Sequence, residues 1–228
     1  MPTSIIYSST DDGYGDLRDS TNWANARGNS DSAADFYDKI NTTNYDWAIW
    51  NIHNRGNYTC RRSFFSFDLS SLSIGIVTAA TLNVWSKDFS ISGFNRVIAV
   101  GVNAALENSD DDFGKIFTDT TGSTTLEDTY SSPVPFNNTS YAYEEMALNP
   151  NALTVINSKV GSGDFQLALI GDYYDGSATN TVPSGGGDYT QIGIGFSDSN
   201  IGTGADPKLT LTYTEALTNN AVFFGMNF

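Results

Sequence analysis

Short segments in which apolar and polar residues alternate recur along this chain, and helical spacing of apolar residues is scarce. An alternation with period two is typical of strands that turn one face toward a core. Residues 207–214, PKLTLTYT, show it most cleanly. Segments rich in Gly, Ser, Thr and Asn separate these stretches, and all-β proteins of this length commonly form one unit. We therefore predict an all-β fold, a jelly-roll-type β-sandwich of about eight strands with one short helix and long loops.

The remaining strands are assigned by the same pattern. An apolar run at 96–106 favours a central position in a sheet, because both of its faces would be buried. Residues 10–58 contrast with it, since they form a long polar segment with scattered aromatic residues. The predicted strands are 3–9, 62–69, 76–86, 96–106, 140–149, 164–174, 190–198 and 207–214.

The segment 61–86 is predicted to form two strands joined by a short polar turn, which is a hairpin. In the first strand Phe65 and Phe67 would face one side and Phe64 the other. These aromatic side chains would fill the space between two sheets, so the segment has a framework role. In the second strand the more apolar set is predicted to face the core: Ile76, Thr78, Ala80, Leu82 and Val84.

One helix is predicted at residues 150–158. Asn149 suits the N-cap position, and Pro150 suits the first helical position because its missing N–H has no partner there anyway. Gly161 lies just beyond the end, where a glycine commonly terminates a helix.

The chain is predicted to comprise a β-sandwich domain at residues 1–214 and an apolar C-terminal tail at 215–228. Exposed to water, such a tail would be an aggregation hazard. We expect it to make assembly contacts by docking on a neighbouring subunit, so that the protein is an oligomer. The alternative is that it adds a strand to its own domain. The contact residues would be Val222, Phe223, Phe224, Met226 and Phe228.

The charge of the chain excludes some partners. Twenty-six acidic residues against 11 basic ones give a formal net charge of −15. A phosphate backbone or an anionic membrane surface would be repelled, so we predict neither nucleic-acid nor membrane binding. The sequence also lacks an apolar run long enough for a membrane-spanning helix. The single cysteine, Cys60, is predicted to be a buried thiol.

Clusters of aspartate raise the question of calcium. Asp11, Asp12 and Asp16 fall in one short segment, and Asp110 and Asp112 fall in another. Calcium takes six to eight oxygen ligands, which such loops can supply. Neither cluster has the spacing of an EF-hand, so solvated acidic loops are the alternative. No other cofactor is predicted.

Three of the four tryptophans, Trp23, Trp47 and Trp50, lie within the polar segment 10–58. Indole rings stack on sugar rings, so one interpretation is a glycan-binding surface. The other is that these side chains pack a long loop against the sandwich. The glycan interpretation rests on these rings being at least partly exposed, and it loses its best support if all three are buried.

No constellation in the sequence predicts catalysis. His53 is the only histidine, and no nucleophile motif accompanies it. Glu144 and Glu145 are adjacent on a predicted strand, so they would point to opposite faces rather than form a carboxylate pair. We predict that the protein is not an enzyme.

Several motifs follow one another in an order that resembles a known family. The stretches are RRSFFSFDLSSL, GIVTAATLNVW, MALNPNALTVINS, FQLALIGDYYD and GADPKLTLTYT. Their order and spacing resemble the DNRLRE-type β-sandwich modules, which are related to carbohydrate-binding modules. The resemblance covers about residues 3–214. It implies a β-sandwich of the kind found in structural proteins of tailed phages and in bacterial surface proteins.

Two functions compete at this stage. One is a virion structural protein of a bacteriophage, such as a capsid decoration, head-fibre or tail component that contacts other virion proteins. The other is a secreted carbohydrate-binding or adhesion module of a bacterial surface. The first sixteen residues have no basic region followed by an apolar one, as a secretory signal would. This favours a virion location, reached by assembly in the host cytoplasm and lysis.

Overall fold

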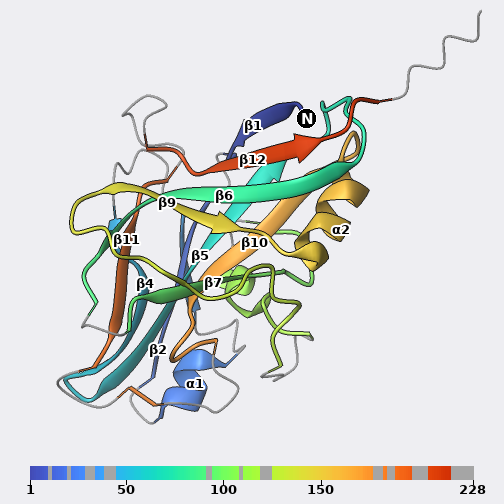
Figure 1. Cartoon of the computed structure of the whole chain (residues 1–228). Coiled ribbons are helices and arrows are strands. Elements are labelled where there is room, and N and C mark those ends of the chain that lie inside the picture. The colour runs from blue at the N-terminus through green and yellow to red at the C-terminus, as the bar shows by residue number, and fades with distance from the viewer. Residues whose placement is uncertain are drawn as a thin grey trace, which may run out of the picture.

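The structure is a computed structural model of the 228-residue chain (Figure 1). It describes residues 1–9, 12–19, 22–28, 34–38, 45–90, 94–107, 110–118, 125–176, 182–183, 188–196 and 205–216. Of residues 34–38, 45–46 and 110–111 it describes the backbone only.

Twelve strands among the described residues form one large antiparallel sheet that folds over on itself into two layers (Figure 1). The first layer has the order β1-β12-β6-β9, and β9 pairs only with β6. Its strands are β1 (Thr3–Tyr7), β12 (Lys208–Tyr213), β6 (Val77–Asp88) and β9 (Ala142–Ala147). The prediction of an all-β, sandwich-like fold is confirmed.

The second layer is built around β5, which is paired along both edges. One edge pairs with β2, and the other pairs first with β4 and then with β10. The strands of this layer are β3 (Ala34–Asp38), β2 (Gly13–Asp19), β5 (Asn57–Asp68), β10 (Asp164–Gly171), β7 (Arg96–Val100) and β8 (Val134–Pro135). At one end the strands β4 (Tyr45–Asn54) and β11 (Thr190–Ile194) continue the hydrogen bonding from β5 to β6.

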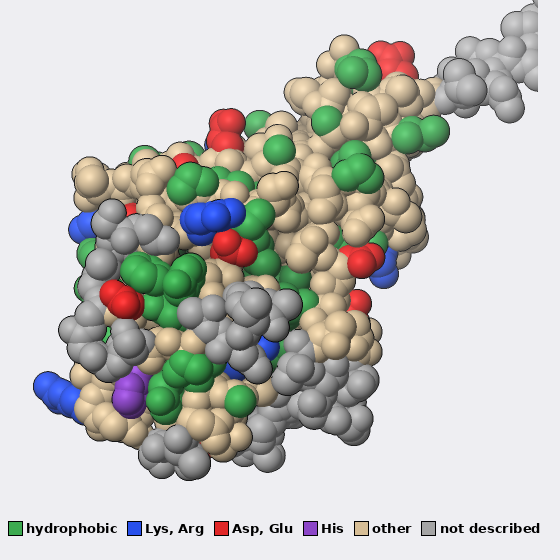
Figure 2. Space-filling view, turned by 60° about the horizontal axis from the view of Figure 1, so that its bottom comes forward, with side chains coloured by type: hydrophobic (Ala, Val, Ile, Leu, Met, Phe, Trp, Pro, Cys, Tyr) green, Lys and Arg blue, Asp and Glu red, His purple; other side chains and the backbone are tan. Residues whose placement is uncertain are grey.

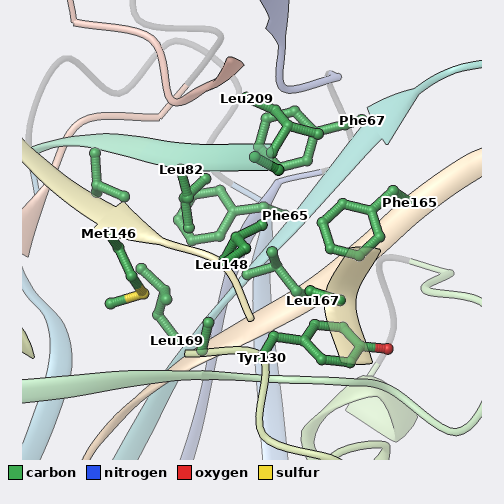
Figure 3. Close-up of a cluster of buried hydrophobic side chains, with 14 of the residues drawn as sticks. Phe65, Phe67, Leu82, Tyr130, Met146, Leu148, Phe165, Leu167, Leu169 and Leu209 are labelled. Atoms are coloured by element: carbon green, nitrogen blue, oxygen red, sulfur yellow. The ribbon is translucent and has the colours of Figure 1, made fainter. Parts of the chain in front are cut away.

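The main core lies between the two layers, and Figure 3 shows part of it. Phe65 and Phe67 of β5 point into this core, whereas Phe64 joins a separate cluster on the outer face of the second layer. The predicted facing of these three side chains is confirmed. Each buried aromatic side chain contributes about 2–3 kcal/mol through removal of apolar surface from water.

The predicted facing of β6 is confirmed for Ala80, Leu82 and Val84, which lie in the core. It is wrong for Ile76, which precedes the strand and is 67% exposed, and for Thr78, which is also exposed. The pairing of β6 with β12 shifts register at its end, and Val77 occupies the core there instead.

The prediction of a β5–β6 hairpin is wrong, because the two strands lie in different layers and share no hydrogen bonds. The connection between them carries Leu69, Leu72 and Ile74, all of which pack on the core. These apolar residues hold the chain as it crosses from one layer to the other. Gly75 ends the crossing where the carbonyl oxygen of Thr214 would lie 2.5 Å from any Cβ, so no larger residue fits there.

The interpretation of residues 10–58 as a polar segment is also wrong. It contains β2, β3, β4 and a short helix, α1 (Trp23–Arg27). The strand β2 escaped the pattern because Asp16, which is 4% exposed, occupies an inward position, and two glycines lie at alternate positions that face the other side. A buried carboxylate interrupts the apolar alternation that marks a strand.

The predicted helix is confirmed as α2 (Pro150–Lys159), with the Asn149 side chain accepting hydrogen bonds from the N–H groups of Asn151 and Ala152. Gly161 has φ +72, as its position beyond the helix requires. The apolar run at 96–106 yields β7, which lies between β10 and the two-residue β8 rather than at the centre of its layer. Its outer face is nevertheless buried by a cluster that includes Ile116 and Phe117.

No helix in the described part of the chain is long and apolar enough to span a membrane. Cys60 is a free, fully buried thiol, as predicted.

Candidate ligand-binding face

The inner face of β5 continues past the core and opens at the end where β4 turns into β5. The two strands are joined by Arg55 and Gly56, and the pairing of Trp50 with Arg61 places those two residues on one face. Asp16 of β2 pairs with Arg61 from the other side. In Figure 2 this end of the molecule is turned toward the reader, with the only histidine, His53, in purple.

A bulge in β4 brings a second tryptophan to this face. The pairing of β4 with β11 shifts so that Ile192 and Ile194, two residues apart, face Ile49 and Tyr45, four residues apart. Such a bulge re-aims the side chains of the longer strand. Trp47 thereby lies beside Trp50, with ring centroids 6.2 Å apart and planes tilted by 35°.

An ion cluster supports the tryptophans from behind. The Arg61 guanidinium lies 4.9 Å from the ring centroid of Trp50 and 5.3 Å from that of Tyr14, within the range of cation–π attraction. Arg61 Nη2 donates to Asp16 Oδ2 at 2.7 Å, and Arg18 donates to the same oxygen at 2.9 Å. We call Arg61, Asp16 and Arg18 the Arg61 cluster. It holds the indole of Trp50 in a fixed position.

A cleft of about 270 Å³ opens beside Trp50. The indole Nε1 of Trp50 is buried and donates to no described residue. Trp47 is 45% exposed, which is unusual for so large an apolar side chain. The cleft residues are Arg18, Trp50, Asn54, Arg55, Asn57 and Thr59. We call Trp47, Trp50 and this cleft the tryptophan face, and we regard it as the candidate site of the protein.

Trp23, the third tryptophan of the glycan hypothesis, does not belong to this face. It is 1% exposed and packs edge-on against Tyr174, with ring centroids 6.3 Å apart. Asn22 caps α1 by accepting a hydrogen bond from Asn25, and the helix buries Trp23 against the outer side of the second layer. The prediction that Trp23 is partly exposed is therefore wrong, whereas Trp47 and Trp50 reach the surface.

Three of the aspartates considered as calcium ligands have protein partners. Asp12 is buried and accepts a hydrogen bond from Ser8, and Asp16 belongs to the Arg61 cluster. Asp112 pairs with Lys115 at 2.7 Å. No group of three or more metal-ligating side chains is found within the described residues. These three carboxylates neutralise cations and satisfy donors of the fold.

Some predicted site residues lie outside the described residues or are described by backbone alone. The side chain of Asp110 is not described. Outside the described residues lie Asp11, Val222, Phe223, Phe224, Met226 and Phe228.

A second ion cluster, which the sequence did not reveal, lies on the opposite face of β5. Arg62 is fully buried and donates to both oxygens of Asp175, at 2.7 and 2.8 Å. It also donates to the carbonyl oxygens of Phe113 and Arg27, at 2.7 and 2.6 Å. Arg27 Nε donates to the Asp175 carbonyl oxygen at 2.8 Å. We call Arg62, Asp175 and Arg27 the Arg62 cluster.

The Arg62 cluster shapes the protonation of two buried groups. Burial alone would raise the pKa of Asp175, but the charges and hydrogen bonds of Arg62, with the charge of Arg27, lower it below its usual value. Burial and the nearby Asp175 charge raise the pKa of Cys60 well above 9.0. Because a thiolate is the reactive form of cysteine, Cys60 is an inert part of the interior.

His53 makes an aromatic contact on the same hairpin. Its ring stacks on Tyr58 at a centroid distance of 4.1 Å and an interplanar angle of 12°. The stack braces the end of the β4–β5 hairpin.

Comparison with known proteins adds no identity: no protein-family model matches the chain, and no curated protein shows a significant match to it.

Proposed function

We propose that the protein is a non-enzymatic structural protein of a bacteriophage virion, which displays its β-sandwich on the particle surface as a capsid decoration, head-fibre or tail component. The resemblance of its strand motifs to modules of tailed-phage structural proteins supports the virion location. The observation that carries the binding part of the proposal is the tryptophan face at the open end of the sandwich. A rigid, well-packed module with one exposed aromatic face suits contact with a surface ligand rather than chemistry.

The ligand class that best fits this face is a glycan. Pyranose rings present flat C–H surfaces that stack on indoles, and their hydroxyl groups need side-chain amides and hydroxyls as partners. Trp47 and Trp50 supply the aromatic surfaces. Asn54, Asn57 and Thr59 supply the polar groups around the cleft. A glycan array should give signals that fall when both tryptophans are replaced by alanine.

Attachment to the particle is the second half of the proposal. The closing strand β12 ends at Tyr213, and the five predicted contact residues of the C-terminal tail follow it in the sequence. We assign the C-terminal tail, residues 215–228, to docking on another virion protein or on a second copy of the chain. Burial of five apolar side chains would contribute on the order of 8–12 kcal/mol before the costs of ordering. Thr214 stays in the truncated variant, because its backbone N–H donates to Ile76.

Purified particles from the source provide the test. Mass spectrometry and immunogold labelling should find the full chain on the particles, and a chain lacking residues 215–228 should fold but be missing from them. Particles that lack the full-length protein would refute the virion location.

An adhesion or carbohydrate-binding module of a bacterial surface is the second candidate, and the tryptophan face favours it equally. Immunogold labelling of cell surfaces without labelling of particles would select this candidate.

A further inference from the structure

The cleft of the tryptophan face is positively charged in a strongly acidic protein. The chain has 26 acidic and 11 basic residues, yet the cleft lining includes Arg18 and Arg55 and no carboxylate. Behind the lining, Asp16 is shared between Arg18 and Arg61. Three guanidinium groups and one carboxylate leave a net positive charge at this site. The Arg18 side chain is 59% exposed, so it can contact a ligand while it remains paired.

Arg55 occupies a position that is unfavourable for arginine. Its φ is +50, and it is the only non-glycine residue with positive φ in the described part of the chain. The following Gly56 has φ +80, so the two residues form the tight hairpin turn in which Asn, Asp or Gly is preferred at the first position. Strained residues of this kind concentrate at functional sites.

The fold itself makes no visible use of the Arg55 side chain. The residue is exposed, and its guanidinium makes no hydrogen bond or ion pair with any described residue. Arg18 and Arg61, in contrast, share a carboxylate. A cation held at the tip of a strained turn, at the rim of a cleft, has its donors available for an external anion.

The remaining lining specifies what kind of anion fits. Trp50 offers an aromatic surface, and Asn54, Asn57 and Thr59 offer amide and hydroxyl groups. A volume of about 270 Å³ lies just below the usual range for small-ligand pockets, which suits a ligand no larger than one sugar unit. A planar guanidinium matches a carboxylate with two parallel hydrogen bonds.

We infer that this cleft binds a pyranose that carries a carboxylate, with the ring on Trp50 and the carboxylate between Arg18 and Arg55. The inference rests on the proposed glycan contact, and it adds that the bound sugar is negatively charged. Uronic acids and sialic acids share this chemistry, and the two sources are separated by the probes below.

Calorimetric titration of the full-length protein tests the inference. The probes are methyl glucuronide, N-acetylneuraminic acid and, as the neutral analogue, methyl glucoside. At least one acidic sugar should bind about tenfold or more tightly than methyl glucoside, and added salt should reduce the difference. Binding of glucuronide alone or of neuraminic acid alone supports the inference and identifies the source.

The variant Arg55→Asn separates binding from stability. Asparagine suits a positive φ, so the melting temperature should stay unchanged or rise, while acidic-sugar affinity should fall about tenfold. Arg96→Asn is the matched control: it removes the same charge from an exposed arginine on β7 that does not line the cleft, and it should bind like the wild type.

Each of the following outcomes would overturn the inference, but only the last would also refute the proposed glycan contact. Equal binding of glucuronide, neuraminic acid and glucoside, lost in Trp50→Ala, would leave the glycan contact standing and remove its charge preference. Wild-type affinity for acidic sugars in Arg55→Asn would likewise refute the role of this residue. Absence of binding to all three sugars would refute both the inference and the glycan contact, whereas the virion location is decided by the particles.

Discussion

Arg61 and Arg62 are neighbours on β5, but their side chains enter two different environments. Arg62 makes four hydrogen bonds, two of them to the two oxygens of Asp175, and its guanidinium lies 4.0 Å from the ring centroid of Phe113. Arg61 shares one oxygen of Asp16 with the exposed Arg18 and lies behind Trp50.

The difference separates framework from recognition. The Arg62 cluster joins α1, the 3-10 helix η2 (Asp110–Gly114) and the turn after β10 to β5, and all three of its side chains are buried. The Arg61 cluster leads outward through Arg18 to a cleft. Alternation along one strand thus gives two adjacent arginines opposite roles, and the predictions below test that contrast.

The largest expected effect is a loss of stability on breaking the buried Arg62 cluster. Arg62→Met leaves the buried Asp175 carboxylate without its main partner, so the free energy of unfolding should fall by about 3–5 kcal/mol. Arg18→Met removes an exposed partner of Asp16 and should cost about 1 kcal/mol or less. Urea denaturation measures both. Equal losses in the two variants would contradict the contrast.

The tryptophans should differ in the same way. Trp23→Ala opens a cavity beneath α1 and should cost about 3–5 kcal/mol, because Trp23 is 1% exposed. Trp47→Ala removes a ring that is 45% exposed and should cost clearly less, about 1–2 kcal/mol. Thermal or urea unfolding of the two variants provides the comparison. A larger loss for Trp47 would show that its ring serves the fold.

A smaller effect concerns pH. The folded state raises the pKa of Cys60, so it keeps the thiol proton that the unfolded state releases above its ordinary pKa of 9.0. The stability linked to this group is present below about pH 9 and is lost as the pH rises toward the folded pKa, with a slope of up to about 1.4 kcal/mol per pH unit. Cys60→Ala should lack this slope.

Denaturation of both proteins between pH 8 and 10 measures the difference in slope, while tyrosine titration is common to both. Parallel pH profiles would mean that Cys60 ionises in the folded state as readily as in the unfolded chain.

Local patterns predicted those parts of the fold that local forces decide. Phe64 faces away from Phe65 and Phe67 as the side-chain alternation of a strand requires. Asn149 and Pro150 mark the start of a helix, because the Asn149 side chain accepts hydrogen bonds from backbone N–H groups of the first turn. The sequence was therefore sufficient to predict the all-β fold, the helix α2 and many of the core residues.

The sequence predicted Trp47 and Trp50 as possible glycan-binding residues, but it could not predict the ion clusters on the two faces of β5, because their contacts join distant residues. Asp16 meets Arg61 across 45 positions, and Asp175 meets Arg62 across 113. When those partners are unknown, an aspartate at an inward position makes the sequence of a strand resemble that of a loop. Exposure of Trp47 and burial of Trp23 depend on a bulge and on helix docking, neither of which leaves a local signal.

The central claim is that β5 turns Arg61 toward a ligand-binding cleft and the neighbouring Arg62 toward the framework. Titration of ¹⁵N-labelled protein with methyl glucuronide, followed by the four indole Nε1–H resonances assigned through Trp→Phe variants, tests it most directly. The account predicts that the Trp50 resonance shifts most and Trp47 next, while the resonance of the buried Trp23 does not move. A shift confined to Trp23, or four unmoved resonances at saturating sugar, would contradict it.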